Sequence, residues 1–414
     1  MSLMSAEVQA NPWDYYAALH ASGKPLHRMP ETGFWLVTSY ELAREVIRQP
    51  DLFASGVSPM ALRPGGIPAA VIQVFMKEGW LPRASCSTSD PPDHTSVRKF
   101  LEPLFTAQRV RQIRPLIEDI VGALADALPE KHPFEFIELY AHPLPMRVIA
   151  ALIGVPTAHL ERFKAWSDAI VEPFSMMVSA EREVECARLV VEMQHFFKRE
   201  LEVRLRSPQA DLLTEVAQAA NAQEFGFNLE QQLTILTIDL LASGNETTTA
   251  AIASGLKLLI ENPAAVIELR NDAGKLEHFI EEVLRLESPA QGMFRRVMQD
   301  TELAGQALSA GDLLSLRFGA ANRDPAQFPT PARLDLTRTS PGRHLAFGLG
   351  RHHCIGAQLA RQEMLSGFTA LLNRFAVFEF APGFPAPTYT PSFFGRNLRH
   401  LHVQCGRESH SATP

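Results

Sequence analysis

The sequence of 414 residues is short of cysteine, of long apolar runs and of excess positive charge. Its four cysteines, Cys86, Cys186, Cys354 and Cys405, are scattered without Cys-x-x-Cys spacing, so they indicate neither a zinc site nor a disulfide framework and suit a reducing cytoplasm. No stretch approaches the ~18 apolar residues of a membrane span, and residues 1–13 lack the regions of a secretory signal. The 39 basic and 46 acidic residues give a net charge of −7, which argues against nucleic-acid binding. We therefore expect a cytoplasmic protein without a membrane or nucleic-acid partner.

The sequence predicts a mainly α-helical chain with a minor β part. Helical periodicity dominates from about residue 107 to 226, where several prolines interrupt it. Two short apolar runs, Leu26–Arg28 and Phe34–Val37, flank a turn-forming segment and indicate a β-hairpin. No internal repeat, low-complexity segment or linker divides the chain, so we expect one domain over residues 1–414.

A long segment rich in proline and glycine, residues 53–90, contains one apolar island at Ile67–Phe75. Loops of this length inside a compact chain are usually functional or disordered. The island favours a segment that covers a substrate, and disorder is the alternative.

Residues 347–356 form a glycine-spaced loop that delivers Cys354 to the first turn of an apolar helix. Gly348, Gly350 and Gly356 lack a Cβ, so the backbone can take unusual dihedral angles and let a flat group approach closely. Free N–H groups at the helix start and the positive end of its dipole stabilise an anion, and the Cys354 thiolate is the anion on offer. A buried structural cysteine at a helix cap is the competing interpretation.

The loop contains the spacing Phe-x-x-Gly-x-His-x-Cys-x-Gly, carried by Phe347, Gly350, His352, Cys354 and Gly356. This spacing resembles the haem-binding loop of the cytochrome P-450 family. The resemblance implies that Cys354 is the thiolate ligand of the iron of haem b (iron protoporphyrin IX), and that the loop, Gly348 included, contacts the cofactor. It also implies the cytochrome P-450 fold, with the haem between the long central helix and the cysteine-loop helix.

Basic and imidazole side chains elsewhere match further motifs of that family. The segment Asp-Pro-Pro-x-His-x-x-x-Arg opens a helix and places His94 and Arg98 four residues apart, on one face. On spacing alone the pair is a solvated helix face, whereas the resemblance implies that both residues contact the haem propionates. By the same resemblance Arg295 is a further propionate contact, and the neighbouring Arg296 could take its place.

Residues 228–262 indicate a single long helix with a cluster of glycine, acid and threonines in its middle. Gly244 costs about 1 kcal/mol relative to alanine, and threonines can bond the carbonyl four residues earlier and open the helix. The cluster indicates either a local widening that admits a small ligand or water, or threonines that only satisfy their own backbone. It resembles the family's central-helix pattern at Gly244, Glu246, Thr247 and Thr248. The resemblance implies that Gly244 lies at the haem and that Glu246 and Thr247 organise proton delivery to dioxygen.

Several side chains near this cluster are candidates for a substrate pocket. Ser243 stands where the family usually has Ala or Gly, and its hydroxyl either tunes water or touches substrate. Asp239, four residues earlier on the same face, is a lone carboxylate that is costly to bury unless it is paired. It either pairs with an arginine or a polar backbone group, or lines the pocket and contacts a polar or basic substrate group. Gln291 and Met293 are further pocket candidates, and Phe394 either projects toward substrate or packs in the core.

Glu282 and Arg285 lie three residues apart on a predicted helix, which places their side chains on neighbouring turns. If exposed, such a pair contributes only a few tenths of a kcal/mol. In the cytochrome P-450 family this spacing is a buried clamp completed by a later arginine. Arg333 is expected to be that third member, although Ala332 departs from the usual acidic residue. We assign these residues to support of the fold and the haem loop.

With the resemblance, the motifs predict a haem-dependent monooxygenase that inserts one oxygen atom of O₂ into a small, largely hydrophobic organic substrate. The sequence shows no flavin or nicotinamide fingerprint, so we expect electrons to come from a separate ferredoxin and ferredoxin reductase. We also expect a monomer. Arg343, Arg351 and Arg361 could form a docking surface for that donor. A peroxide-driven haem peroxygenase and a non-catalytic haem-binding sensor are the alternatives, and retention of Glu246 and Thr247 disfavours both.

Overall fold

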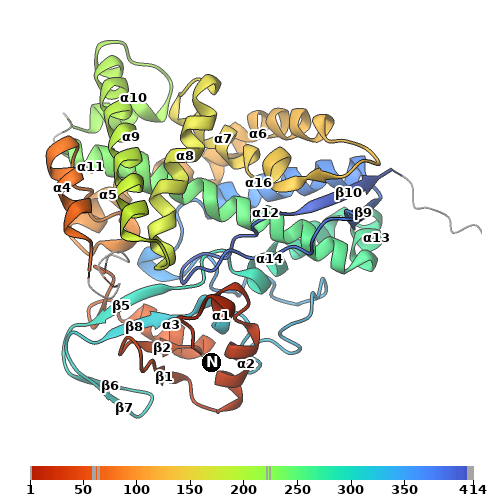
Figure 1. Cartoon of the computed structure of the whole chain (residues 1–414), viewed down its shortest axis with the longest axis horizontal. Helices are drawn as coiled ribbons and strands as arrows, with labels where there is room; N and C mark the ends of the chain where they lie inside the picture. The colour runs from red at the N-terminus through yellow and green to blue at the C-terminus, as the bar shows by residue number, and fades with distance from the viewer. Residues whose placement is uncertain (1, 58–61, 63–65, 221, 223–224, 408–414) are drawn as a thin grey trace, which may run out of the picture.

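The computed structural model describes residues 2–57, 62, 66–220, 222 and 225–407. Most of them belong to a helical part built around the central helix α12, and a smaller part contains the main β-sheet together with the first three helices (Figure 1). The prediction of a mainly α chain with a minor β part is confirmed.

Polar side chains begin several helices as N-caps. Ser39 accepts a hydrogen bond from the N–H of Leu42 at the start of α3, and Asn228 accepts one from the N–H of Gln231 at the start of α11. The α-helices are α1 Ala6–Ala10, α2 Trp13–Ala21, α3 Tyr40–Arg48, α4 Ala69–Glu78, α5 Asp93–Leu101, α6 Ala107–Ala127, α7 Pro143–Ile153, α8 Leu160–Val171, α9 Ala180–Arg206, α10 Leu212–Ala219, α11 Leu229–Thr234, α12 Ser243–Glu261, α13 Pro263–Asn271, α14 Leu276–Glu287, α15 Phe318–Ala321 and α16 Ala357–Arg374.

The strands form three sheets. The strands are β1 Leu26–Arg28, β2 Trp35–Val37, β3 Phe53–Ala54, β4 Phe134–Glu135, β5 Met293–Val297, β6 Thr301–Leu303, β7 Gln306–Leu308, β8 Leu313–Leu316, β9 Val377–Phe380 and β10 His402–Gly406. The main sheet has the order β1-β2-β8-β5-β3, the second has β4-β10-β9, and β6 pairs with β7. The predicted hairpin is confirmed, because Leu26 pairs with Val37 and Arg28 with Trp35 in antiparallel register.

The stretch predicted as one long helix is helical throughout but widens before its middle. α11 passes into a π-helical segment, Ile235–Ala242, which continues as α12. Such π turns occur frequently at functional sites. The widening precedes the glycine and threonine cluster and does not coincide with it. Thr247 also makes the expected bond to its own helix, because its Oγ1 donates to the carbonyl of Ser243 at 3.0 Å.

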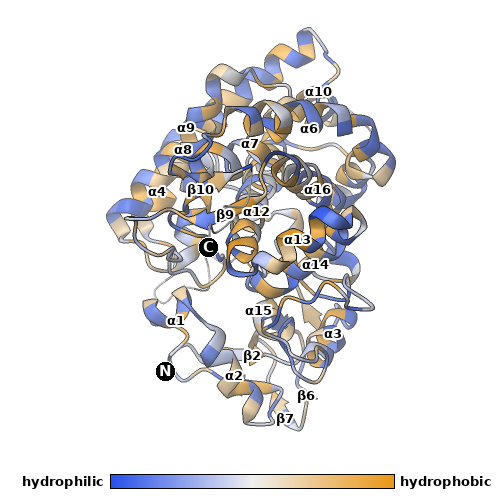
Figure 2. Cartoon of the chain, turned by 90° about the vertical axis from the view of Figure 1, so that its right-hand side faces the viewer, coloured by the Kyte–Doolittle hydropathy of each residue, from blue (hydrophilic) through white to orange (hydrophobic). Residues whose placement is uncertain are grey.

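The central helix α12 and the cysteine-loop helix α16 approach each other closely at Gly255. A Cβ at this position would lie 2.4 Å from a ring carbon of Phe368 in α16. That ring is only 1% exposed and packs edge-on against Phe279 of α14, with 5.2 Å between ring centroids. Phe368 therefore has no room to move aside, and the approach requires glycine. The middle of α12 is largely apolar, whereas outer helices such as α9 carry polar residues (Figure 2).

The described part of residues 53–90 is fastened to the helical part. Its apolar island forms α4, whose valines pack against α9. Gln194 of α9 accepts from the N–H of Trp80 at 3.0 Å and donates to its carbonyl at 2.8 Å. The N–H of Arg83 donates to Oγ1 of Thr234 at 3.0 Å. These contacts favour the interpretation of a covering segment over that of a disordered loop.

No single helix in the described part of the chain has the length and apolar content needed to cross a membrane. One bent pair, Leu229–Glu261 with Pro263–Asn271, meets the length and composition criteria when taken together, with an angle of 103° at the break.

Replacing Gly255 by alanine is expected to lower the free energy of unfolding by about 1–3 kcal/mol, because the added methyl group overlaps the Phe368 ring. The loss exceeds the gain of about 1 kcal/mol that alanine brings to a helix interior. Urea unfolding of the purified protein measures the difference.

The matched control is Gly122→Ala in α6, where no atom lies within 4 Å of the added Cβ. Here the helix-propensity gain is unopposed, and an increase of up to about 1 kcal/mol is expected. Equal effects of the two substitutions would contradict the close approach of α12 and α16.

Candidate active site

The loop that carries Cys354 folds back on itself. The N–H of Cys354 donates to the carbonyl of Phe347 at 2.8 Å. Gly348 and Gly350 have φ values of +65° and +68°, in the left-handed region that favours glycine. α16 begins directly after Gly356, so the cysteine lies just before the helix N-terminus and not in the first turn, where it was expected.

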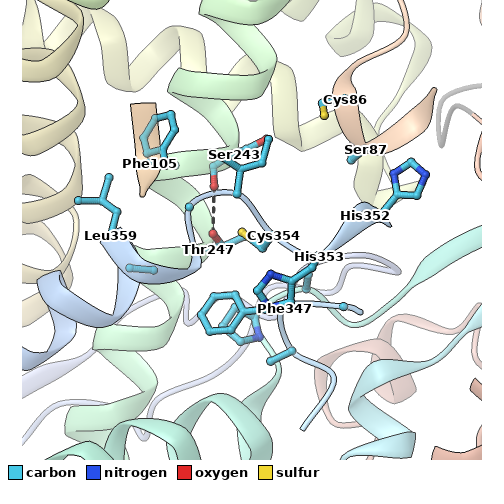
Figure 3. Close-up of a pocket in the computed structure, with 18 of the residues that line it drawn as sticks. Cys86, Ser87, Phe105, Ser243, Thr247, Phe347, His352, His353, Cys354 and Leu359 are labelled. Carbon is cyan, nitrogen blue, oxygen red and sulfur yellow. Dashed lines mark hydrogen bonds between the residues drawn. The ribbon is translucent and has the colours of Figure 1, made fainter. Parts of the chain in front are cut away.

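Cys354 borders a cavity of about 310 Å³ between its loop and the central helix. Ser243 and Thr247 on α12 face the loop that carries the cysteine (Figure 3). The accessible surface of Cys354 opens into this cavity. Burial raises the pKa of its thiol, while the N–H of Gly356 and the guanidinium of Arg98 act in the opposite direction. Burial outweighs the helix N-terminus here, contrary to the simple expectation of a lowered thiol pKa.

Two imidazoles and two guanidinium groups border the same cavity: His94 and Arg98 from α5, Arg295 from β5 and His352 from the cysteine loop. The rings of His94 and His352 lie 4.2 Å apart between centroids. Burial lowers the pKa of both imidazoles, that of His352 to about 3. At neutral pH the two rings are therefore uncharged N–H donors, and the positive charge comes from the two arginines.

Strand alternation decides between the two adjacent arginines of β5. Arg295 is 5% exposed and lines the cavity, and burial lowers its pKa to about 10. Arg296 is exposed on the opposite face of the strand. Arg295 is therefore the member of this pair that can reach a bound group.

Thr247 and Glu246 are neighbours in sequence but border different cavities. Thr247 lines the cavity of Cys354, whereas Glu246 lines a second cavity together with His142, Lys164 and Asp168. The Glu246 carboxyl accepts hydrogen bonds from Ser167 at 3.3 Å and Asn245 at 3.2 Å. Burial raises the pKa of Glu246 to about 7, and the charge of Asp168 acts in the same direction. The carboxyl can therefore exchange a proton near neutral pH.

The observed geometry of Asp239 agrees in part with each of its two interpretations. Its Oδ1 accepts a hydrogen bond from the backbone N–H of Cys86 at 2.9 Å, which is the pairing with a backbone group. The residue also lines the cavity of Cys354, as the alternative required. Its partner segment could not be foreseen, because Cys86 lies more than 150 residues away in the sequence.

Two of the expected pocket residues do not line this cavity in the described structure. Gln291 is 2% exposed, and its Nε2 donates to the carbonyls of Glu287 and Ser288, so it closes the end of α14. Phe394 packs against Phe294, with 5.6 Å between centroids. The pocket prediction is wrong for Gln291. For Phe394 the structure has the core-packing alternative, whereas Met293 and Ser243 line the cavity.

The clamp forms around Glu282 with one change of partner. Glu282 and Arg285 are fully buried and paired at 2.6 and 2.9 Å. The third side chain is that of Arg338, whose Nε donates to Glu282 at 3.0 Å. Arg333 is exposed and contributes only its backbone carbonyl, which accepts from Arg285 at 3.1 Å. The prediction of Arg333 as the third member is wrong, because its side chain points to solvent.

The polar atoms at the cavity fit a flat dianionic cofactor with a thiolate-bound metal. The Nε2 of His94 and both ring nitrogens of His352 are buried without hydrogen-bond partners in the described part of the chain. Buried polar groups normally have partners. Arg98 and Arg295 add positive charge, and the thiol of Cys354 faces the cavity. Haem, with two propionates and an iron that accepts a thiolate, suits this donor set.

Comparison with known proteins agrees with this description. The family model for cytochrome P450 matches residues 72–393. The chain is 33% identical over 381 residues to the cytochrome P450 monooxygenase PikC of Streptomyces venezuelae, covering 90% of this chain and 86% of that protein. It is 31% identical to the vitamin D(3) 25-hydroxylase of Pseudonocardia autotrophica, covering 98% and 97%. The structure of cytochrome P450 CYP109Q5 from Chondromyces apiculatus has a TM-score of 0.84 at 31% identity and covers 99% of both chains.

The fold and the cysteine-loop site define a haem-thiolate protein. The chain belongs to the cytochrome P450 family, and the two relatives named above are a bacterial monooxygenase and a bacterial hydroxylase. It is accordingly an oxidoreductase of the P450 monooxygenase class.

The substitution Arg338→Ala is expected to lower the free energy of unfolding by about 1–3 kcal/mol, because the buried Glu282 carboxylate loses one of its charged donors. Chemical unfolding followed by circular dichroism measures the loss. Arg333→Ala is the matched control and is expected to change stability by less than about 0.5 kcal/mol, since its side chain is exposed. A larger loss for Arg333→Ala than for Arg338→Ala would reverse the assignment.

Proposed function

We propose that this chain inserts one oxygen atom of O₂ into a small, largely hydrophobic organic substrate, with Cys354 as the thiolate ligand of haem b. The overall reaction is RH + O₂ + 2 e⁻ + 2 H⁺ → ROH + H₂O. The proposal rests above all on the shared cavity that places Ser243 and Thr247 of the central helix opposite the Cys354 loop. Residues 1–414 act in this proposal as one domain and as a monomer.

The cofactor would be held at its two propionates by His94, Arg98, Arg295 and His352. Arg98 also donates to the carbonyl of His353 at 2.6 Å, which ties the propionate side to the cysteine loop. Gly244, Phe347, Gly348 and Gly356 border the same space. Bound haem supplies the reductive activation of dioxygen and the oxygen transfer.

The remaining cavity wall supports an apolar substrate. Apolar side chains from three helices and one strand border the space, and they exclude water from it: Leu101, Ile149, Leu240 and Met293. Cys86 and Ser87 border it from the segment that precedes α5. This segment is the candidate cover of the site, and Ser243 adds a hydroxyl on the central helix.

Glu246 and Thr247 are proposed to move protons from the second cavity to the first. Glu246 takes up a proton where His142, Lys164 and Asp168 border the second cavity. Thr247 donates its hydroxyl hydrogen to the carbonyl of Ser243, so its oxygen remains able to accept a hydrogen bond inside the first cavity. A rotation of the Glu246 side chain around the helix would connect the two cavities. The hydrogen bonds of Glu246 to Ser167 and Asn245 restrain this rotation.

A separate ferredoxin and ferredoxin reductase are proposed to supply the electrons. Of the three arginines expected to dock the donor, Arg361 pairs with Glu281 at 2.6 and 2.9 Å, which removes it from a surface role. Arg343 is exposed, and Arg351 lies 3.5 Å from Asp51 on the surface. The docking surface in this proposal is therefore limited to Arg343 and Arg351.

Replacing Cys354 by alanine is expected to abolish the red-shifted Soret band of the ferrous–CO complex, because the thiolate ligand is lost. Absorption spectra of the reduced haem protein under CO measure it. Cys86→Ala, which removes another thiol of the same cavity, is the control and retains the band. Survival of the band in Cys354→Ala would refute thiolate ligation by this residue.

The choice of oxidant is decided in the same holoenzyme preparation. Substrate-dependent NAD(P)H consumption with ferredoxin and reductase supports the monooxygenase. Turnover with hydrogen peroxide alone would favour a peroxygenase, and absence of turnover with every donor would favour a sensor.

Glu246→Gln is expected to slow turnover roughly a hundredfold while ligand binding is unchanged, because the amide cannot carry the proton.

The same variant changes the pH dependence of stability. The native protein keeps the Glu246 proton up to about pH 7, whereas an unfolded chain releases it near 4.5. The free energy of unfolding therefore falls as pH rises from the unfolded pKa to the native pKa of Glu246. The variant has no carboxyl at this position and does not lose this stability.

Thermal unfolding midpoints between pH 5 and 8 measure this effect. The midpoint of the variant is expected to rise relative to that of the parent as pH increases. Glu261→Gln removes an exposed carboxylate at the far end of α12 and serves as the control. Parallel curves for Glu246→Gln and the parent would contradict a buried carboxyl that stays protonated near neutrality.

A further inference from the structure

Asp239 belongs to the cavity wall but takes no part in the proposed proton path or in holding the cofactor. It lies in the π-helical segment, four residues before Ser243. The N–H of Cys86 occupies its Oδ1 at 2.9 Å. Its Oδ2 is buried and has no hydrogen-bond partner within the described residues. One oxygen of this carboxylate is thus fixed by the protein and the other is left to a ligand.

The surrounding protein does not neutralise this carboxylate. Burial raises the pKa of Asp239 to about 7, and the hydrogen bond from the Cys86 N–H acts in the opposite direction. The two arginines at the cavity, Arg98 and Arg295, come from α5 and β5 and are assigned to the propionates. An unpaired carboxylate in an apolar cavity costs several kcal/mol. A partner brought by a ligand would remove this cost.

Glu363 is the other acid that borders the cavity, and it differs from Asp239 in position. It lies on α16, the helix that follows the thiolate ligand, and is 2% exposed. Asp239 lies on the opposite wall, on the helix that carries Thr247, next to the covering segment that contains Cys86. Of the two acids, Asp239 is the one on the substrate side.

We propose that Asp239 anchors a protonated amine, so that substrates of this enzyme join a basic nitrogen to an apolar body. This proposal rests on the monooxygenase function above. A protonated amine supplies an N–H donor and a positive charge as the partner of Oδ2. Charge-assisted hydrogen bonds are roughly twice as strong as neutral ones. Leu240 and Ile149 border the same cavity, and an attraction between opposite charges is stronger in such apolar surroundings than in water.

The position of the anchor also limits where such a substrate is oxidised. Asp239 lies eight residues before Thr247 on one continuous helical stretch. At about 1.5 Å of rise per residue the two positions are roughly 12 Å apart along the axis. A substrate held at Asp239 therefore presents a carbon several bonds away from its nitrogen to the Thr247 end of the cavity. Hydroxylation of the apolar body is expected, and removal of the groups on nitrogen is not.

The test uses four decyl compounds that differ only in the head group: N,N-dimethyldecylamine, decyltrimethylammonium, 1-decanol and decanoic acid. Dissociation constants for the haem-loaded enzyme are measured by the spin-state shift of the Soret band and, independently, by titration calorimetry. Both cations are expected to bind more tightly than 1-decanol: the protonated amine at least about tenfold, because it brings charge and an N–H donor, and decyltrimethylammonium by a smaller factor, because it brings charge alone. Decanoic acid is expected to bind more weakly than 1-decanol. The trimethylammonium probe cannot bond the iron through nitrogen, so it separates anchoring from ligation.

Asp239→Asn is expected to abolish the preference for the two cations while 1-decanol binds as before. Glu261→Gln makes the same change of charge at the exposed far end of the central helix and is expected to keep the preference. Equal binding of all four probes to the parent enzyme, or an undiminished preference in Asp239→Asn, would overturn the proposal. The probe comparison on the parent enzyme decides even if Asp239→Asn does not fold.

The two proposals fail in different measurements. Loss of cation preference in an enzyme that still shows the red-shifted CO band and donor-dependent turnover would remove the amine anchor alone. Cation preference without turnover would leave Asp239 as a binding residue and remove the monooxygenase function.

Discussion

The contact between the central helix and the cysteine-loop helix constrains the rest of the structure. At Gly255 the two helices leave no space for a Cβ beside the buried ring of Phe368. From this contact the same helices extend to the cavity, where one carries Thr247 and the other begins just after Cys354. Because α12 and α16 are both fixed at this contact, core packing and not the loop sets the separation of the cysteine from the threonine.

The loop itself is held by charges that lie outside the cavity. Glu282 binds Arg285 and Arg338, and Arg285 in turn donates to the carbonyls of Asn322 and Pro331. The side chain of Asn322 accepts from the N–H of Leu345, just before the cysteine loop. A buried carboxylate with several donors thus positions an irregular segment that has no strand or helix of its own. This division separates residues that hold the loop from residues that border the cavity.

Local patterns carried most of what could be predicted. The cysteine loop, the His94 and Arg98 pair and the cap at Asn228 each depend on neighbours in sequence. The structure confirms the cap and places His94, Arg98 and Cys354 at one cavity. Side-chain direction in irregular segments was not predictable. In the irregular segment around Arg333, the carbonyl of this residue accepts from Arg285 while its side chain is exposed. Gln291 was misassigned because it lies at a helix end, where its amide satisfies open carbonyls.

One helix serves two cavities because successive residues point about 100° apart. Asp239, Ser243 and Thr247 recur every four residues and share one cavity, whereas Glu246 faces the other. The sequence motif joins Glu246 to Thr247 as neighbours, but the fold keeps their side chains on opposite sides of a wall. In the proposed function, a proton would pass from the second cavity to the first without opening the first to solvent, with Asp239 binding substrate and Glu246 carrying protons. Separation by helix face thus gives Asp239 and Glu246, two acids seven residues apart, two different environments.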